Sequence, residues 1–200
     1  MSLFWDERFA EPGYKYGRAP NAFLRAQAAG LKAAGRVLVP GDGEGRNGVW
    51  LAGQGHTVLS VDSSSVGLTK AQALAAEAGV AIETVVADLA DWTPPAPAWD
   101  ALVLIYLHLP SALRAQVHQR LAEALAPGAL VIVEAFHPDQ LGRSSGGPKD
   151  ADMLYTLEQL RADFGPRCDE LLGWQGEVEL DEGPGHQGAG LVTRYVARRR

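Results

Sequence analysis

The sequence predicts an α/β fold in which helices cover both faces of a mostly parallel β-sheet. Five short apolar segments alternate mostly with amphipathic helical segments, an alternation that is typical of parallel sheets. The chain has 200 residues, 46% of them hydrophobic and 21% charged, so it is long and apolar enough to build one such core, and this composition argues against global disorder. A glycine-rich turn follows the first apolar segment, at the edge where these sheets bind ligands.

The expected strands are short apolar runs, because strands buried on both faces lack a polar side. Five of these runs occupy 36–40, 56–62, 81–87, 100–107 and 129–136. Two further strand-like runs, 171–180 and 191–199, are joined by the turn-rich segment 181–190 and should form an antiparallel hairpin.

Capping residues and helix breakers bound the expected helices. Asn21 is a good N-cap, and the helix that it starts should end at Gly35 in a left-handed conformation. Further helices are expected at 46–52, from Ser64 or Ser65 to 78, from Ser111 to the break at Pro127-Gly128, and from the Thr156–Gln159 capping box to 164. The aromatic-rich segment 1–20 looks irregular, and two consecutive prolines make 93–98 a loop.

The charge and the single cysteine exclude several functions. A formal net charge of −6 and a pI near 5.3 argue against binding nucleic acid or an anionic membrane through overall charge. No apolar run approaches the roughly 20 residues of a membrane helix, and no signal-peptide pattern opens the sequence. Cys168 stands alone and the histidines share no ligand spacing, so no metal site is expected. We expect a cytoplasmic monomer or homodimer.

The strongest chemical signal is the loop after the first strand, where Gly41, Gly43 and Gly45 alternate. Glycine permits a left-handed backbone and lets a ligand approach the main chain closely. The N–H groups at the start of the following helix point at such a ligand. A turn of this kind is expected to hold a nucleotide or nucleoside cofactor.

Two cofactors fit these glycines. The spacing G-x-G-x-x-G at 43–48 matches the dinucleotide fingerprint, and the same loop matches a G-x-G-x-G turn for S-adenosylmethionine. In both interpretations Asp62, at the end of the second strand, should bind the ribose hydroxyls. Asp88 and Leu89 favour S-adenosylmethionine, because the carboxylate can accept from the adenine amino group while the Leu89 N–H donates to the ring. The segment after residue 136 is also short for a dehydrogenase's substrate domain.

With these residues the chain resembles the class I S-adenosylmethionine-dependent methyltransferases, and among them small bacterial enzymes grouped with tellurite-resistance and thiopurine methyltransferases. The segments that carry the resemblance are VLVPGDGEGRNGVWLA (37–52), VLSVDSSSVGL (58–68), VVADLADW (85–92), IYLHLP (105–110) and APGALVIVEAF (126–136). It implies one domain over 1–200 with a Rossmann-like seven-stranded sheet, order 3-2-1-4-5-7-6, strand 7 antiparallel. It also implies in-line methyl transfer from S-adenosylmethionine to a small-molecule acceptor such as a thiol or chalcogen oxyanion, leaving S-adenosylhomocysteine.

The resemblance extends the cofactor site beyond the glycines and the two acids. It adds Asn47, Ser63 and Ile105 to the cofactor-binding residues. Many family members carry an acid two residues before the first glycine, where this chain has Val39, and Asp42 inside the loop is expected to supply the missing negative charge.

The segment 1–20 is expected to fold over the cofactor as a lid. In that position Tyr16 would form an aromatic wall beside the sulfonium, and Arg18 would pair with the methionine carboxylate or an anionic acceptor. The alternative is an aromatic segment that is packed only for stability.

The acceptor should lie where the fourth and fifth strands end. His108 is a candidate catalytic base or acceptor ligand there, and a helix-capping histidine is the alternative. The loop 137–155, with His137, Arg143 and the turn 144–148, is expected to border the acceptor, and His186 in the hairpin turn is a weaker candidate. Because no base is obvious, a non-catalytic S-adenosylmethionine-binding protein remains an alternative, as does an NAD-dependent oxidoreductase.

Overall fold

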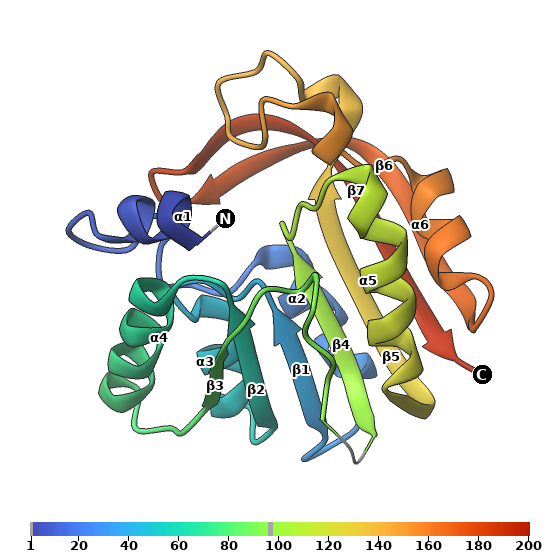
Figure 1. The fold of residues 1–200 in the computed structure, drawn as a ribbon, viewed down its shortest axis with the longest axis horizontal. Helices are drawn as coiled ribbons and strands as arrows, with labels where there is room; N and C mark the ends of the chain where they lie inside the picture. The colour runs from blue at the N-terminus through green and yellow to red at the C-terminus, as the bar shows by residue number, and fades with distance from the viewer. Residues whose placement is uncertain (1, 96–97) are drawn as a thin grey trace.

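Seven strands form one mixed sheet in the order β3-β2-β1-β4-β5-β7-β6 in a computed structural model that describes residues 2–95 and 98–200 (Figure 1). The strands are β1 (Arg36–Pro40), β2 (Thr57–Asp62), β3 (Glu83–Val86), β4 (Trp99–Ile105), β5 (Leu125–Phe136), β6 (Cys168–Glu182) and β7 (His186–Arg199). The first five pair in parallel, and β7 is antiparallel to both of its neighbours. The sheet order and the antiparallel seventh strand are therefore confirmed.

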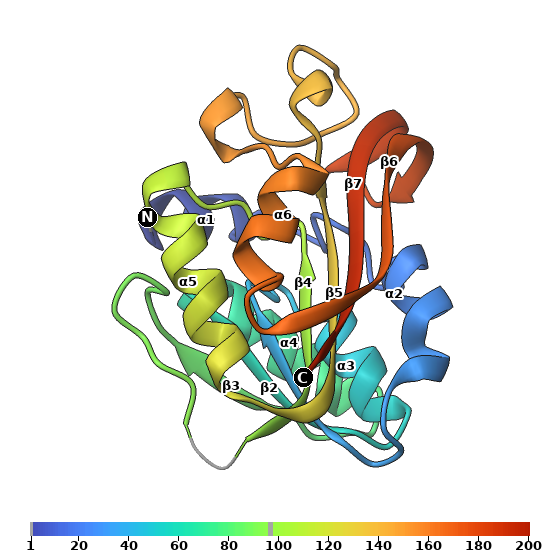
Figure 2. The same ribbon diagram turned by 90° about the vertical axis from the view of Figure 1, so that its right-hand side faces the viewer.

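Helices lie on both faces of the sheet (Figure 2). The helices are α1 (Ser2–Phe9), α2 (Ala22–Gln27), α3 (Arg46–Gly53), α4 (Ser65–Glu77), α5 (Ser111–Glu123) and α6 (Leu157–Phe164), with short 3-10 turns at Ala28–Gly30, Pro138–Gln140 and Ala151–Met153. Asn21 and Ser64 cap α2 and α4, and Thr156 forms the expected capping box with Gln159.

The core is divided between the two faces by the alternation of side chains along each strand. In β1, Leu38 belongs to the cluster that contains Val117 of α5, whereas Val37 and Val39 belong to the cluster that contains Leu51 of α3. Successive side chains of a strand point to opposite faces, so a continuous apolar run fills both cores. This arrangement fixes the carboxyl ends of β1, β2 and β4 side by side.

The structure corrects several expected boundaries in the first half of the chain. The segment 1–20 is not wholly irregular, because α1 forms within it. The helix after Asn21 ends at Gln27, and the left-handed residue near its expected end is Ala34 (φ 51°) rather than Gly35. Part of the expected loop 93–98 is described, but residues 96–97 lie outside the described residues.

Further corrections concern α5, β5 and the hairpin. Pro110, not Ser111, is the N-cap of α5, and the helix ends at Glu123, so Pro127-Gly128 lies in β5 where its pairing with β4 is irregular. The expected turn 181–190 is mostly strand, since only three residues separate β6 from β7. Within the described ranges, no helix is long and apolar enough to cross a membrane.

Candidate functional site

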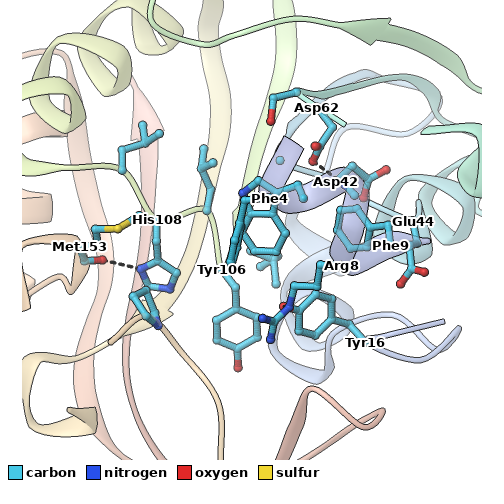
Figure 3. A pocket seen from close by; sticks show the side chains of 18 of the residues that line it. Phe4, Arg8, Phe9, Tyr16, Asp42, Glu44, Asp62, Tyr106, His108 and Met153 are labelled. Atoms are coloured by element: carbon cyan, nitrogen blue, oxygen red, sulfur yellow. Dashed lines mark hydrogen bonds between the residues drawn. The ribbon is translucent and has the colours of Figure 1, made fainter. Parts of the chain in front are cut away.

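A cavity of about 780 Å³ opens at the edge of the sheet where β1, β2 and β4 end. Its wall combines the glycine loop, the first residues after those strands, α1, the segment 147–153 and the start of β7. In Figure 3, Asp62 and Asp42 lie on one side, His108 and Met153 lie on the other, and Tyr106 lies between them. Such a volume suits a small-molecule or cofactor site.

The glycine loop has the left-handed backbone that its sequence predicts. Gly41, Gly43 and Gly45 have φ angles of 71°, 56° and 86°. Gly41 and Gly43 line the cavity. Gly45 does not: a Cβ there would stand 2.5 Å from the Cβ of Ala71 in α4. The structure therefore gives Gly45 a packing role beneath the cavity, at the N-cap of α3.

Asp62 organises the loop as well as facing the cavity. One carboxylate oxygen accepts the Gly43 N–H at 2.9 Å, and the other accepts the Ser64 N–H at 2.9 Å. Burial raises the pKa of Asp62, although the backbone N–H groups oppose that change. Ser63 follows it on the cavity wall. The Asp62 carboxylate is therefore already held in one orientation before a ribose binds at this edge.

Asp42 lines the cavity, but both of its oxygens already have partners inside the protein. The Ser60 hydroxyl donates to one at 2.5 Å, and the Gly48 N–H donates to the other at 3.2 Å. Burial raises the pKa of Asp42 to about 6. The carboxylate therefore joins the loop to β2 and α3, and the structure does not present it as a free charge.

The Asp42→Asn variant is expected to be more stable than the natural protein at pH 8 and to lose that advantage at pH 4. The pKa of Asp42 is about 6 in the folded protein, against 3.8 ordinarily. The free energy of unfolding of the natural protein therefore falls as pH rises from 3.8 to about 6, because the buried carboxyl must ionise. At pH 8 the free energy of unfolding of the variant should be about 1–3 kcal/mol higher than that of the natural protein. Any hydrogen-bond energy that is lost when the amide replaces the carboxylate reduces this gain. Urea unfolding at the two pH values measures the difference, and a constant difference would contradict the pKa assignment.

The adenine candidates lie beyond the end of β3. Asp88 is exposed on the cavity wall, and its side chain accepts the Ala90 N–H at 2.9 Å. Leu89 is buried beside it, and Ile105, the last residue of β4, lines the same wall. The structure thus brings these three predicted residues to the cavity that Asp62 faces.

Of the two residues predicted from the N-terminal segment, only Tyr16 reaches the cavity. Its hydroxyl accepts a hydrogen bond from Arg8 Nε at 3.1 Å, and its ring lies 4.5 Å from that of His186. Arg18 points away: its guanidinium pairs with Glu77 and lies 5.3 Å above the Tyr14 ring. The structure does not bring Arg18 to the candidate site.

His108 lines the cavity with a partner at each ring nitrogen. Nδ1 lies 2.7 Å from the Met153 carbonyl oxygen, and Nε2 accepts a long hydrogen bond of 3.4 Å from the Phe136 N–H. Burial lowers the pKa of His108 to about 4, so the ring is neutral at pH 7. This geometry supports a positioning role for His108, and its catalytic role stays a prediction.

Beside the cavity, a buried ion pair was not anticipated from the sequence. Arg46, at the start of α3, donates to Glu182 at 2.7 Å, and both side chains are almost fully buried. Burial opposes ionisation of Glu182, but His186 and Arg46 outweigh it and lower its pKa to about 2. The second terminal nitrogen of Arg46, Nη1, is buried without a partner.

Asn21 connects that ion pair to the centre of the sheet. Its side-chain amide donates to Glu182 at 2.8 Å and to Glu134 of β5 at 2.5 Å, and its N–H donates to Asn47 Oδ1 at 3.0 Å. Arg194 completes the charge balance by donating to Glu134 at 2.6 Å. A capping residue therefore also fixes Asn47, which lines the cavity.

The N-terminal helix α1, which the sequence did not predict, borders the cavity and holds the start of α4. Asp6 accepts from the Ser64 hydroxyl at 2.6 Å and from the Val66 N–H at 3.3 Å, which caps α4. Phe4 and Phe9 line the cavity, and a Cβ on Gly43 would stand 2.9 Å from Phe9. The sequence signal available was the density of aromatic residues before Asn21.

The residues of this cavity fit an adenosine-containing cofactor. Gly41 and Gly43 offer backbone without side chains, Asp62 and Asp88 stand at the ends of adjacent strands, and aromatic rings line the rest. The buried, unpartnered Arg46 Nη1 on the same wall is a donor for an anionic group.

Part of the chain is similar to known methyltransferases. Residues 37–128 match the family model of a methyltransferase domain. The chain is 31% identical over 138 residues to the 2-heptyl-1-hydroxyquinolin-4(1H)-one methyltransferase of Mycobacteroides abscessus, covering 65% of this chain. The matched region spans only 60% of that relative's length.

Solved structures share the fold. The structure of TehB from Haemophilus influenzae matches 100% of this chain and 67% of its own, with a TM-score of 0.70 at 15% identity. The N-methyltransferase NodS from Bradyrhizobium japonicum, in complex with S-adenosyl-L-homocysteine, matches 99% of this chain and 97% of its own, with a TM-score of 0.71 at 12% identity. Over residues 37–128 the chain therefore matches a methyltransferase domain, and its seven-stranded sheet has the fold of these solved structures.

Proposed function

We propose that this protein transfers the methyl group of S-adenosylmethionine to a small-molecule acceptor by in-line displacement. The observation that carries the proposal is one cavity with two unlike walls. The glycine loop, Asp62 and Asp88 form one wall, and a set of aromatic and histidine side chains forms the other. A cofactor on the first wall would have an acceptor beside it on the second.

Different residues would bind different parts of the cofactor. Gly41 and Gly43 would let it approach the main chain, Asp62 would accept from the ribose hydroxyls, and Asp88 with Leu89 would contact the adenine. When bound, S-adenosylmethionine supplies a methyl group that its sulfonium already activates. The chain therefore needs mainly to orient the acceptor and to exclude water.

The acceptor is proposed to be small, planar and largely apolar, with a thiol, a hydroxyl or a chalcogen oxyanion as the methylated group. The rings of Tyr106 and Phe136 line its side of the cavity, next to His186. The Mycobacteroides relative is named for methylating a hydroxylated quinolone, which is a molecule of this shape.

Calorimetric titration with S-adenosylhomocysteine tests the cofactor part of the proposal, and binding in the micromolar range is expected. No binding at millimolar concentration, or displacement of S-adenosylhomocysteine by NAD(H), would refute it. Mass spectrometry on a panel of thiols, chalcogen oxyanions, halides, amines and phenols then tests transfer, because a methylated product gains one methylene unit of mass. Binding without any transfer would favour the non-catalytic alternative.

A further inference from the structure

His186, the first residue of β7, is clamped by aromatic rings on the acceptor side of the cavity. The ring centroids of Tyr16 and Tyr106 each lie 4.5 Å from that of His186, and the centroid of Phe136 lies 5.1 Å away. His186 is only 5% exposed. Its imidazole is therefore held in one orientation, which a catalytic group requires.

The two ring nitrogens of His186 have different surroundings. Nδ1 is buried and faces Glu182 Oε2 at 3.8 Å, too far for a hydrogen bond but near enough for the carboxylate to favour a proton on Nδ1. Nε2 makes no hydrogen bond within residues 2–95 and 98–200. Gly146 faces this side of the ring, and a Cβ there would stand 2.5 Å from His186 Cδ2 and 3.4 Å from Nε2. The glycine therefore lets the turn 144–148 pack closely against this edge of the ring, which lies on the cavity wall.

The Glu182–His186 pairing follows from the register of the hairpin. The two residues are directly opposite across the three-residue turn, so their side chains lie on the same face. Arg46 donates to the same Glu182 oxygen that faces Nδ1. Glu182 is thus fixed by Arg46 while it faces the imidazole.

The charged groups around His186 come from three elements. Glu182 raises its pKa, Arg46 and Arg8 lower it, and the phenols of Tyr16 and Tyr106 are neutral near pH 7. Burial is the largest effect and lowers the pKa of His186 overall. The ring is therefore neutral at pH 7, with an unshared electron pair on Nε2.

The unpartnered Nε2 distinguishes His186 from His108, whose two ring nitrogens both have partners. We propose that His186 Nε2 is the general base that takes the proton from a hydroxyl-bearing aromatic acceptor, with Glu182 holding the other proton on Nδ1. The inference rests on the proposed methyl transfer and names the acceptor class for that site.

The proton and electron balance is complete without another reactant. The acceptor's O–H bond breaks and its proton moves to His186 Nε2, while the oxygen bonds to the methyl carbon. The bond between that carbon and the sulfonium breaks, and its electron pair stays on sulfur in S-adenosylhomocysteine. The imidazolium then returns its proton to water. A hydroxyl needs this help at pH 7, whereas a thiol acceptor is already partly ionised.

The test compares 1-naphthol with 1-naphthalenethiol, two acceptors of the same shape. In the His186→Gln variant, kcat/KM for the naphthol should fall roughly 10²–10⁴-fold, while that for the thiol should fall less than about tenfold. The affinity for S-adenosylhomocysteine should not change. His56→Gln, the same substitution just before β2, is the matched control and should leave both rates unchanged.

NMR titration of the natural protein gives a second readout that needs no turnover. The His186 ring signals, assigned by their loss in His186→Gln, should titrate below the ordinary pKa and show the proton on Nδ1. A proton on Nε2 at pH 7, equal losses on both acceptors, or methylation of the thiol only would overturn the assignment. Failure of the natural protein to bind S-adenosylhomocysteine would instead refute the proposed function.

Discussion

The Asp62→Ala variant is expected to bind S-adenosylhomocysteine more weakly by roughly 1–3 kcal/mol, because hydrogen bonds to a charged group are lost. The same substitution removes the acceptor for the Gly43 and Ser64 N–H groups, both of which the carboxylate holds at 2.9 Å. The loop would then lose its fixed shape along with its ligand. A fall in the free energy of unfolding of about 1–3 kcal/mol is therefore expected as well.

Two measurements separate these effects. Calorimetric titration with S-adenosylhomocysteine gives the loss of affinity, and urea unfolding without ligand gives the loss of stability. Asp91→Ala is the matched control, because Asp91 is exposed and lies off the cavity wall, so both quantities should stay unchanged. Unchanged affinity in Asp62→Ala would move the ribose site elsewhere.

The strands and the glycine loop were predictable because their signals are local. A run such as Arg36–Pro40 is apolar throughout, and strands buried on both faces need that composition. The left-handed angles at Gly41 and Gly43 follow from the one residue type that adopts them freely. Asp62 follows because its place at the end of β2 fixes its position relative to that loop.

The helix α1 was not predictable because what holds it lies far along the chain. Asp6 caps α4, almost 60 residues later, and Phe9 is buried against Gly43 and Gly67. Arg18 was misplaced for the same reason, since Glu77 and the Tyr14 ring draw it away from the cavity. Tertiary contacts outweigh local pattern in short segments of this kind.

The hairpin shows how composition can mislead. Glycines in 181–190 suggested a long turn, yet Gly188 and Gly190 pair within the ladder with Leu180 and Val178. Gly190 is needed there because a Cβ would stand 2.6 Å from Leu180 Cδ1. With the turn shortened to three residues, His186 moves from an exposed loop to the cavity wall. An acid four residues before a histidine in a glycine-rich turn was the available signal.

The Asp163→Ala variant is expected to be the most destabilised of these substitutions, by about 3–5 kcal/mol, because it leaves a buried cation without its partner. Asp163, in α6, accepts from Arg114 Nε at 2.8 Å and lies 2.8 Å from His118 Nδ1, both on α5. All three residues are at least 93% buried, and both Arg114 Nη1 and His118 Nε2 already lack partners. No other buried carboxylate among the described residues faces this arginine.

The pH dependence of stability should follow from the same cluster. Burial opposes ionisation of Asp163, but His118 and Arg114 outweigh it and lower its pKa, so its contribution is present at neutral pH and lost as pH falls. Burial also lowers the pKa of His118, so protonating that ring costs stability as pH falls below its ordinary value of 6.5, a higher range than that of Asp163. Between pH 7 and pH 4 the Asp163→Ala variant should therefore lose more stability than the natural protein, because its His118 has lost the carboxylate that favours the protonated ring, while the Asp163 contribution of the natural protein is lost only below pH 3.8.

Urea unfolding at the two pH values measures both effects, and Asp169→Ala is the control. Asp169 forms an exposed ion pair with Arg200, so its loss should cost at most about 1 kcal/mol at either pH. S-adenosylhomocysteine affinity should stay unchanged in both variants, because neither residue lines the cavity. If Asp163→Ala lowers the free energy of unfolding no more than the control does, the Arg114 guanidinium must reach water without its partner. The cluster would then not be what joins α5 to α6.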